Sequence, residues 1–290
     1  MSDLIIVEKN ILLNKEEACG LEKNSFGKIR IASHSASNLA IKLLVMMLAV
    51  ITIAAFFTFD YKEINLAEAI SATFTNIKTV FLEPVLKRET VRGILYQLLV
   101  TFCLGALSTI FGAILALICS LFCASNISSP TVARVIKSMI AVIRAVPTVL
   151  WVLIFAVSAG LGSVSAVIGL TFHSFAYLTK VYAESIEEIN SGTIEALRAS
   201  GANFWQIVCQ AVIPATISYI VAWTFMRFEI NFANAVAMGA AAGAGGIGYH
   251  LYMAGNFYFD LHEMGFLTYV VVIAVVILET FSTKIKEWVK

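Results

Sequence analysis

Charged side chains are scarce in this sequence. Asp, Glu, Lys and Arg make up 13% of its 290 residues, against about a quarter in a typical soluble domain. Hydrophobic residues make up 59%, so we expect a protein of the lipid bilayer. The net charge of +1 at pH 7 argues against a nucleic-acid partner, because binding to a phosphate backbone requires a strongly basic face.

Patterns of catalytic and metal-binding residues are also missing. No cysteine spacing suits a metal, and His173, His250 and His262 are scattered, so we expect no metal site. No nucleophile with a neighbouring base and no pair of catalytic carboxylates stands out, so we expect neither an enzyme nor a cofactor in this chain. Four cysteines lie in or beside apolar segments and are expected to be small buried side chains: Cys103, Cys119, Cys123 and Cys209.

The sequence has no G-x-x-x-x-G-K-[ST] loop, so this chain is not expected to bind ATP phosphates itself. Gly243, Gly245 and Gly248 do match the G-x-G-x-x-G dinucleotide fingerprint. That fingerprint requires a strand before it and a helix after it, whereas an Ala-rich helical segment precedes it here. We expect these glycines to permit close helix packing or a broken helix.

Long apolar segments dominate the rest of the chain. No short apolar run with a small-residue cleavage site occurs at the start, so we expect no removable signal peptide. No alternating barrel pattern occurs, and lipid cannot satisfy an open backbone. We therefore predict an all-α integral membrane protein with about six transmembrane helices, each near the required 20 or so residues. The six segments are 39–59, 94–123, 145–159, 163–181, 212–238 and 266–281.

The distribution of Lys and Arg predicts the orientation. With the N-terminus in the cytoplasm, 13 of these residues lie on the cytoplasmic side, 5 lie on the other side, and 2 lie within spans. The outer loop mixes charges with apolar residues at helical spacing, and both an interfacial helix and a solvated linker fit it. The predicted parts are a cytoplasmic N-terminal tail (1–38), a first transmembrane helix (39–59), an extracytoplasmic loop (60–92), a transmembrane core (93–283) and a cytoplasmic C-terminal tail (284–290).

A polar, amphipathic stretch, EALRASGANFWQIVCQAVIP, lies between the fourth and fifth apolar segments. We expect Glu195, Ala196 and Leu197 to begin a short helix whose small residues permit close approach by a partner. Gly201 can end this helix, because glycine accepts the positive φ that often follows a helix. The first half of the stretch therefore predicts one short helix on the cytoplasmic side.

The second half of the stretch predicts another helical turn. Large apolar side chains are expected on its surface at Phe204, Trp205, Ile207 and Val208. Pro214 fits the first turn of the next span, where its missing N–H is not needed. The spacing leaves two alternatives open: a docking element for a partner protein, or a connector on the membrane surface anchored by Trp205.

This stretch resembles the EAA loop of ABC importer permeases, in which Glu-Ala-Ala is followed by Gly and then by a Leu-Pro pair. Leu197 and Ile213 are mild departures from that pattern, and Gln210 replaces an aliphatic residue. The resemblance implies that 190–214 is a coupling loop, a short pair of cytoplasmic helices that contacts a separate ATPase. The residues implied in ATPase coupling are Glu195, Ala196, Leu197, Gly201, Phe204, Trp205 and Pro214.

The flanking sequence narrows the resemblance. RAVPTVLWVLIF from Arg144, LTKVYAESIEEI from Leu178 and RFEINFANAVAMGAAAGAGGIG from Arg227 look like the phosphonate-type permeases. One departure is Ala233, where that branch usually has an Arg. If that Arg handles an anionic ligand, its absence leaves open whether the cargo is phosphonate, a related oxyanion or another ligand.

The resemblance implies a transmembrane permease subunit of an ABC importer in the prokaryotic plasma (inner) membrane, with both termini in the cytoplasm. Its implied partners are an ABC ATPase dimer that binds the ATP, an extracytoplasmic substrate-binding protein and a second copy of the chain. The implied cargo is phosphonate or a related oxyanion. The alternatives are a permease for another small solute, an ion-coupled secondary transporter and a membrane scaffold that transports nothing.

Three polar residues lie inside the fifth apolar segment: Arg227, Glu229 and Asn231. A charge at that depth costs about 2.5–3.5 kcal/mol, so it usually faces protein or water. Arg227 and Asn231 are four residues apart and share a helix face, whereas Glu229 points elsewhere. The three residues are predicted to line or brace a translocation path, and the alternative is a structural pairing with polar groups of the third or fourth span.

Overall fold

The computed structural model describes residues 36–58 and 65–289, and every regular element in those ranges is a helix. The predicted all-α fold is confirmed, while residues 1–35 of the predicted N-terminal tail lie outside the described ranges. The chain divides into two compact units, Met1–Ala69 and Ile70–Lys290. The helices are α2 (Ala36–Thr58), α3 (Leu66–Leu82), α4 (Val91–Cys123), α5 (Pro130–Ala145), α6 (Thr148–Ala159), α7 (Ser163–Glu187), α8 (Ser191–Ala199), α9 (Phe204–Ile207), α10 (Ile213–Ala242), α11 (Gly246–Tyr252) and α12 (Leu261–Val289), with π-helical turns η1 (Val208–Val212) and η2 (Met253–Phe257).

Five helical stretches are long and apolar enough to cross a membrane, and α5 with α6 forms a sixth candidate. α5 and α6 are bent by 89° at the break between them. The third span predicted at 145–159 takes in only α6, whose 12 residues are too few to cross a membrane alone, so its bounds are wrong. The five unbroken stretches are Leu39–Thr58, Val91–Cys123, Ser163–Glu187, Phe204–Ala242 and Leu261–Glu287.

The break between α5 and α6 has a local cause. Val146 has an extended backbone with φ −84° and ψ 126°, the conformation that a following proline, Pro147, favours. The Trp151 indole N–H donates to the Ile143 carbonyl at 2.9 Å. This bond satisfies one of the carbonyl groups left open at the end of α5.

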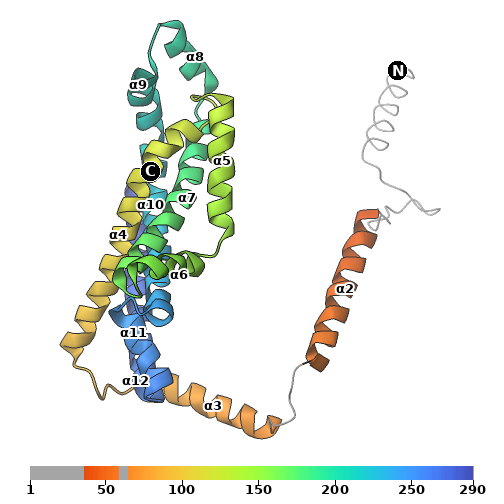
Figure 1. The fold of residues 1–290 in the computed structure, drawn as a ribbon, viewed down its shortest axis with the longest axis vertical. Helices are drawn as coiled ribbons and strands as arrows, with labels where there is room; N and C mark the ends of the chain where they lie inside the picture. The colour runs from red at the N-terminus through yellow and green to blue at the C-terminus, as the bar shows by residue number, and fades with distance from the viewer. Residues whose placement is uncertain (1–35, 59–64, 290) are drawn as a thin grey trace, which may run out of the picture. The chain divides into compact units, whose positions relative to one another are not determined.

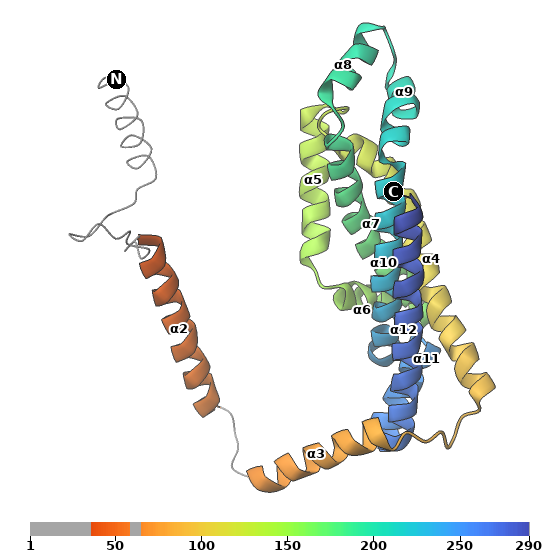
Figure 2. The same ribbon diagram turned by 180° about the vertical axis from the view of Figure 1, so that it is seen from behind.

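The helices α4, α7 and α10 pack against one another and form the centre of the second unit (Figures 1 and 2). Small residues allow the close contact. A Cβ added at Gly112 of α4 would lie 2.8 Å from the Cβ of Ser174 in α7. A Cβ added at Gly105 would lie 3.1 Å from the Phe232 Cα in α10. Small residues at interfaces are the usual device by which membrane helices approach closely.

The second unit has two distinct ends. α8 and α9 lie at one end, and α11 and the start of α12 lie at the other (Figures 1 and 2). We call them the α8 end and the α11 end. α5 runs beside α7 from the α8 end toward the middle of the unit, where α6 crosses it (Figure 1).

The last turns of α3 pack on α12 at the α11 end. The Tyr269 hydroxyl donates to the Phe81 carbonyl at 2.6 Å, and the two rings meet edge to face. Most of the predicted loop 60–92 is therefore structured, and it contains a helix rather than only a linker; residues 60–64 are not described.

An ion-pair cluster follows α3. Lys87 Nζ lies 3.0 Å from Asp260 Oδ2. Arg88 Nη1 lies 3.2 Å from the same oxygen and 3.1 Å from Glu263 Oε2. The Arg88 guanidinium also lies 4.4 Å from the centroid of the Tyr258 ring. The cluster ties the segment after α3 to the start of α12.

The glycine-rich turn after α10 permits close packing, as predicted. Gly243 ends α10 in the left-handed region with φ 59°. α11 then folds back onto α10, so that a Cβ added at Gly239 would lie 2.6 Å from the Tyr249 nitrogen. These glycines bring two helices together, which is a different role from phosphate binding.

Two further expectations differ in detail. α12 continues to Val289, so the predicted C-terminal tail is helical through that residue. Cys123 is buried as expected, but Cys103 and Cys209 are exposed, and the expectation of burial is wrong for those two. Cys119 is partly buried.

Candidate functional site

The predicted coupling stretch folds into α8 and α9 at the α8 end (Figure 1). Gly201 ends the first helix with φ 81°. The N–H groups of Gly201 and Ala202 donate to the carbonyls of Arg198 and Leu197, each at 3.0 Å. This is a glycine-terminated helix end of the expected kind. The structure confirms the helix and its glycine stop, and the coupling role stays a prediction.

The second helix begins with a capping box. The Asn203 side chain accepts the Gln206 N–H at 2.9 Å, and the Gln206 side chain accepts the Asn203 N–H at 2.7 Å. α9 then continues through η1 into α10, where Pro214 lies in the first turn as predicted. Proline cannot donate the N–H that a continuous α-helix needs. A π-helical turn, in which the Ile213 N–H donates to the Val208 carbonyl, comes just before Pro214. The helix is therefore widened next to the residue that lacks an N–H.

Buried apolar side chains fix the helix pair to the rest of the unit. Ile194 of α8 and Ile207 of α9 belong to one buried cluster with Leu121 of α4 and Ile186 of α7. Interiors of this kind are close-packed and transmit displacement rather than absorb it. A movement of the helix pair must therefore also move the ends of α4 and α7.

The surface of the second helix differs from the prediction. Ile207 and Val208 are only 5% and 2% exposed, so the expectation that they present an apolar surface is wrong. Phe204 is half-buried and stacks on Phe122 of α4, with ring centroids 5.8 Å apart. Trp205 is 60% exposed. The helix turns its apolar face toward α4 and α7, and of these four side chains only Trp205 faces outward.

The outer surface of the helix pair combines small, acidic and aromatic side chains. Glu195 and Ala196 are exposed on α8, and Leu197 is half-buried. An exposed Trp beside small residues suits a protein interface, because the ring supplies contact area and the small side chains let a partner approach. The exposed sequence-predicted residues therefore share one end of the molecule.

Arg227 and Asn231 of α10 join a buried hydrogen-bond network. Arg227 Nε donates to Ser174 Oγ of α7 at 3.0 Å, and its Nη2 lies 2.8 Å from His173 Nδ1. Asn231 Nδ2 donates to Ser174 Oγ and to Thr109 Oγ1 of α4, both at 2.8 Å. The pairing with polar groups of the fourth span, α7, is thus present, and a role in a translocation path stays a prediction.

Glu229 has a different partner. Its Oε1 lies 3.4 Å from Lys286 Nζ of α12. The expected separation of Arg227 and Glu229 on the helix is confirmed, because the two side chains contact different helices. The three predicted path residues therefore do not form one cluster.

Sequence reasoning missed the partners in the network. Ser174 and Thr109 each contact Asn231, and Tyr177 lies 5.1 Å from the Arg227 guanidinium, measured to the ring centroid. The available signal was the polar pair His173-Ser174 inside an apolar span, since polar groups at that depth usually face protein. Which polar groups meet depends on packing between helices, which the sequence pattern does not specify.

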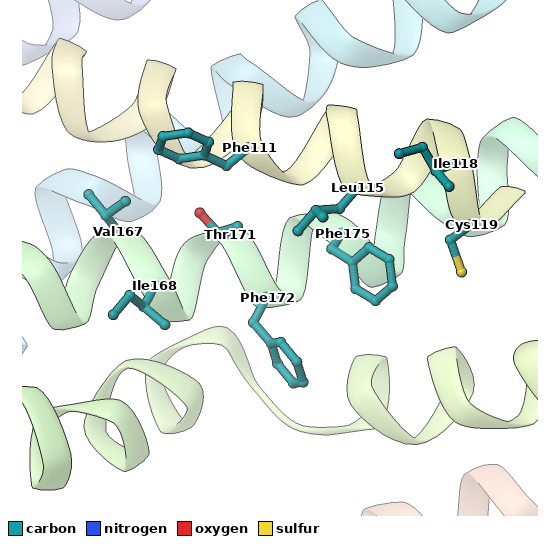
Figure 3. A pocket seen from close by; sticks show the side chains of 9 residues that line it. All are labelled: Phe111, Leu115, Ile118, Cys119, Val167, Ile168, Thr171, Phe172 and Phe175. Carbon is teal, nitrogen blue, oxygen red and sulfur yellow. The ribbon is translucent and has the colours of Figure 1, made fainter.

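One pocket of the described chain is lined almost entirely by apolar side chains. It has a volume of about 700 Å³ and lies along α4 and α7, where Phe111, Leu115, Phe172 and Phe175 line it (Figure 3). The Thr171 hydroxyl also lines it and has no hydrogen-bond partner. The lining has no charged side chain, so this cavity does not suit an ion. Within 36–58 and 65–289, no group of three or more His, Cys, Asp or Glu side chains could hold a metal.

Comparison with known proteins supports a transport role. The family model for the "binding-protein-dependent transport system inner membrane component" matches residues 109–289. The phosphate-import permease protein PhnE of Mycolicibacterium smegmatis is 31% identical over 153 residues, which are 52% of this chain and 29% of that protein. The phosphite transport system permease protein PtxC of Stutzerimonas stutzeri is 28% identical over 203 residues, which are 70% of this chain and 72% of that protein.

A solved structure shares the fold. The chain matches a permease chain of the MetNI methionine ABC transporter in an inward-facing conformation, with a TM-score of 0.64 and 22% identity. The match covers 71% of this chain and all of that chain. The resemblance to ABC importer permeases of the phosphonate type is confirmed by the family match and by the phosphate, phosphite and phosphonate permeases among the relatives. This chain belongs to the family of binding-protein-dependent transport system inner membrane components, the permeases of ABC importers.

Proposed function

We propose that this permease carries phosphonate or a related small oxyanion, works as a homodimer, and is driven by a separate ATPase dimer that contacts α8 and α9. An extracytoplasmic binding protein would deliver the ligand. The observation that carries the coupling part is the attachment of α8 and α9 to α4, α5 and α7 through one buried cluster. A partner that moves the helix pair would move the transmembrane helices with it.

The orientation belongs to the same proposal. The α8 end would face the cytoplasm and the α11 end would face outward, with both termini inside. This orientation puts 13 Lys and Arg residues on the cytoplasmic side and 5 on the other, as the positive-inside rule favours. The chain lacks a G-x-x-x-x-G-K-[ST] loop, so the partner would bind the ATP. ATP-driven closure of the ATPase dimer would then shift α8 and α9 and switch the path between inward- and outward-facing states.

Two observations support an oxyanion cargo. The relatives PhnE and PtxC are named for phosphate import and phosphite transport. Arg227 is buried among the helices and is only 2% exposed. Its guanidinium contacts Ser174, His173 and the Tyr177 ring rather than a carboxylate. A guanidinium that has no carboxylate partner among the described residues keeps its charge for an anion, which it can bind through two parallel N–H groups.

The test is uptake by the complete complex in proteoliposomes. The permease is reconstituted with its ATPase and binding protein, and uptake of phosphate, phosphite and methylphosphonate is measured. We expect uptake of at least one of these anions with ATP on the ATPase side and none without ATP. Uptake driven by an ion gradient without ATP would support a secondary transporter instead. Uptake of methionine and of none of the three anions would support a permease for another solute.

A further inference from the structure

A charged cleft lies between α5 and α7 on the side of the buried network nearer the α8 end. Its volume is about 210 Å³, several times the roughly 30 Å³ that a water molecule occupies in the liquid. Five charged side chains line it: Lys137, Arg144, Lys180, Glu184 and Glu187. The cleft therefore has room for a small ion with some water.

Both carboxylates in the cleft already have cationic partners. Lys137 Nζ lies 2.7 Å from Glu187 Oε1, and Lys180 Nζ lies 3.2 Å from Glu184 Oε1. Glu187 also accepts hydrogen bonds from the N–H and the hydroxyl of Ser125, both at 2.7 Å. Each of these two Lys–Glu pairs has no net charge. The net positive charge of the cleft therefore comes from the remaining cation, Arg144.

Arg144 has an aromatic neighbour and no acid. Its guanidinium lies 5.9 Å from the centroid of the Tyr177 ring, and it forms no ion pair within the part of the chain that the structure describes. An arginine cannot be deprotonated in a protein and carries five N–H donors in a planar fork. A planar donor set with no carboxylate to satisfy it fits an oxyanion better than it fits any other small ligand.

Tyr177 connects the cleft with the buried network. The same ring lies 5.1 Å from the Arg227 guanidinium, so two arginines contact one tyrosine from two helices, α5 and α10. Arg144 is the penultimate residue of α5, two residues before the break at Val146. Both guanidinium groups therefore lie near a single aromatic side chain, and Arg227 is buried whereas Arg144 lines the cleft.

We propose that the α5–α7 cleft is a second anion subsite, in which Arg144 binds the transported oxyanion between the Arg227 network and the α8 end. This inference rests on the proposed oxyanion cargo. Arg144 attracts the anion out of the buried region, Tyr177 contacts both cationic positions, and the Lys–Glu pairs keep the rest of the cleft neutral. An anion that moves between two cationic positions never has to lie in the apolar interior without a counter-charge.

The phosphate of a lipid headgroup has the same chemistry as a free oxyanion, and the experiment must separate the two. Uptake is measured with the complete complex in vesicles of phosphatidylcholine and in vesicles that also contain phosphatidylglycerol, with whichever of phosphate, phosphite or methylphosphonate the wild type takes up fastest. We expect Arg144→Gln to lower uptake at least tenfold in both kinds of vesicle, with ATP hydrolysis stimulated by the binding protein within twofold of wild type.

The matched control is Arg134→Gln, because Arg134 is an exposed arginine on the same helix that does not line the cleft. We expect it to keep uptake within twofold. If Arg144→Gln fails to assemble with the ATPase, uptake by the Arg144→Lys variant is the test of the subsite. This variant keeps the charge but loses the planar fork, and we expect uptake between the Arg144→Gln limit and wild type.

Three results would overturn the subsite. The first is an uptake rate equal to that of wild type in Arg144→Gln, or in Arg144→Lys if Arg144→Gln does not assemble. The second is an effect of Arg144→Gln only in vesicles with phosphatidylglycerol, which would assign the cleft to a lipid headgroup. The third is an equal loss in Arg134→Gln. A wild-type complex that takes up none of the three anions would instead contradict the oxyanion cargo, and the subsite would fall with it.

Discussion

At the residue scale, Asn231 connects α10 to two other helices. Its side chain donates to Thr109 of α4 and Ser174 of α7 and accepts from the Ser174 hydroxyl. We expect Asn231→Leu to destabilise the protein by about 1–2 kcal/mol, because interhelical hydrogen bonds in membranes average about 0.6 kcal/mol each. Unfolding in detergent by titration with dodecyl sulfate measures the loss.

The control for this change is Asn234→Leu. Asn234 lies on the same helix, is only partly buried, and has no side-chain hydrogen bond within the described ranges. We expect the midpoint of its unfolding by dodecyl sulfate to stay close to that of wild type. Equal losses in the two variants would show that the network at Asn231 contributes nothing specific.

Asp260 gives the α11 end a pH dependence. Burial raises its pKa, but hydrogen bonds from Lys87, from the Glu263 N–H and from Arg88 lower it, and the net pKa lies below the ordinary value near 3.8. A carboxylate with a lowered pKa stabilises the fold above its unfolded pKa, and this stabilisation is lost as the pH falls through the folded value. We expect the thermal midpoint of the detergent-solubilised protein to fall between about pH 5 and pH 3.

Asp260→Asn should remove part of that pH dependence, since the amide has no charge to lose. Glu279→Gln is the matched control, because Glu279 is exposed on the same helix and has no ion pair in the described chain. We expect the slope of the midpoint against pH to decrease in the first variant and to stay the same in the second. Unchanged slopes in both variants would rule out Asp260 as the source.

At the element scale, the α8–α9 pair depends on the backbone of Gly201. Its φ of 81° is strained for any residue with a Cβ, although no atom lies within 4 Å of the position where a Cβ would be. The left-handed region costs roughly 1–2 kcal/mol for such a residue. We expect Gly201→Val to weaken co-purification with the ATPase and ATP hydrolysis stimulated by the binding protein, while the level of folded permease in the membrane stays normal.

Gly201→Asn separates backbone strain from bulk. Asn adds a side chain of similar size but tolerates the left-handed region, so we expect coupling close to that of wild type. Full coupling in Gly201→Val would refute the docking role of this helix end. Equal defects in both variants would show that bulk on the surface matters, rather than the turn.

The elements that the sequence predicted well are those with a strong local signal. The glycine stop at Gly201 and the proline start at Pro214 follow from backbone chemistry that any fold must respect. The α5–α6 break was missed although Pro147 was visible, because a proline near an apolar run permits both a helix start and a sharp bend. The burial of Ile207 and Val208 was missed because the partner face on α4 and α7 lies far away in sequence.

At the scale of the whole molecule, composition alone predicted the membrane location and the all-helical fold. Apolar segments of about 20 residues have few other stable solutions in lipid. The contacts between α4, α7 and α10 were beyond reach, because apolar faces that point to protein and to lipid look alike in sequence. For the same reason the buried partners of Arg227 were not predicted, while its need for partners was.

α9, η1 and α10 form a single helical stretch of 39 residues, Phe204–Ala242, which corresponds to about 58 Å at 1.5 Å per residue. A rod of that length acts as a lever arm: a tilt of about 5° at one end swings the other end by about 5 Å. The far end of this arm is the turn at Gly243, where α11 folds back. A small tilt at the Trp205 end would therefore displace the turn at Gly243 by several ångströms, without any intervening loop.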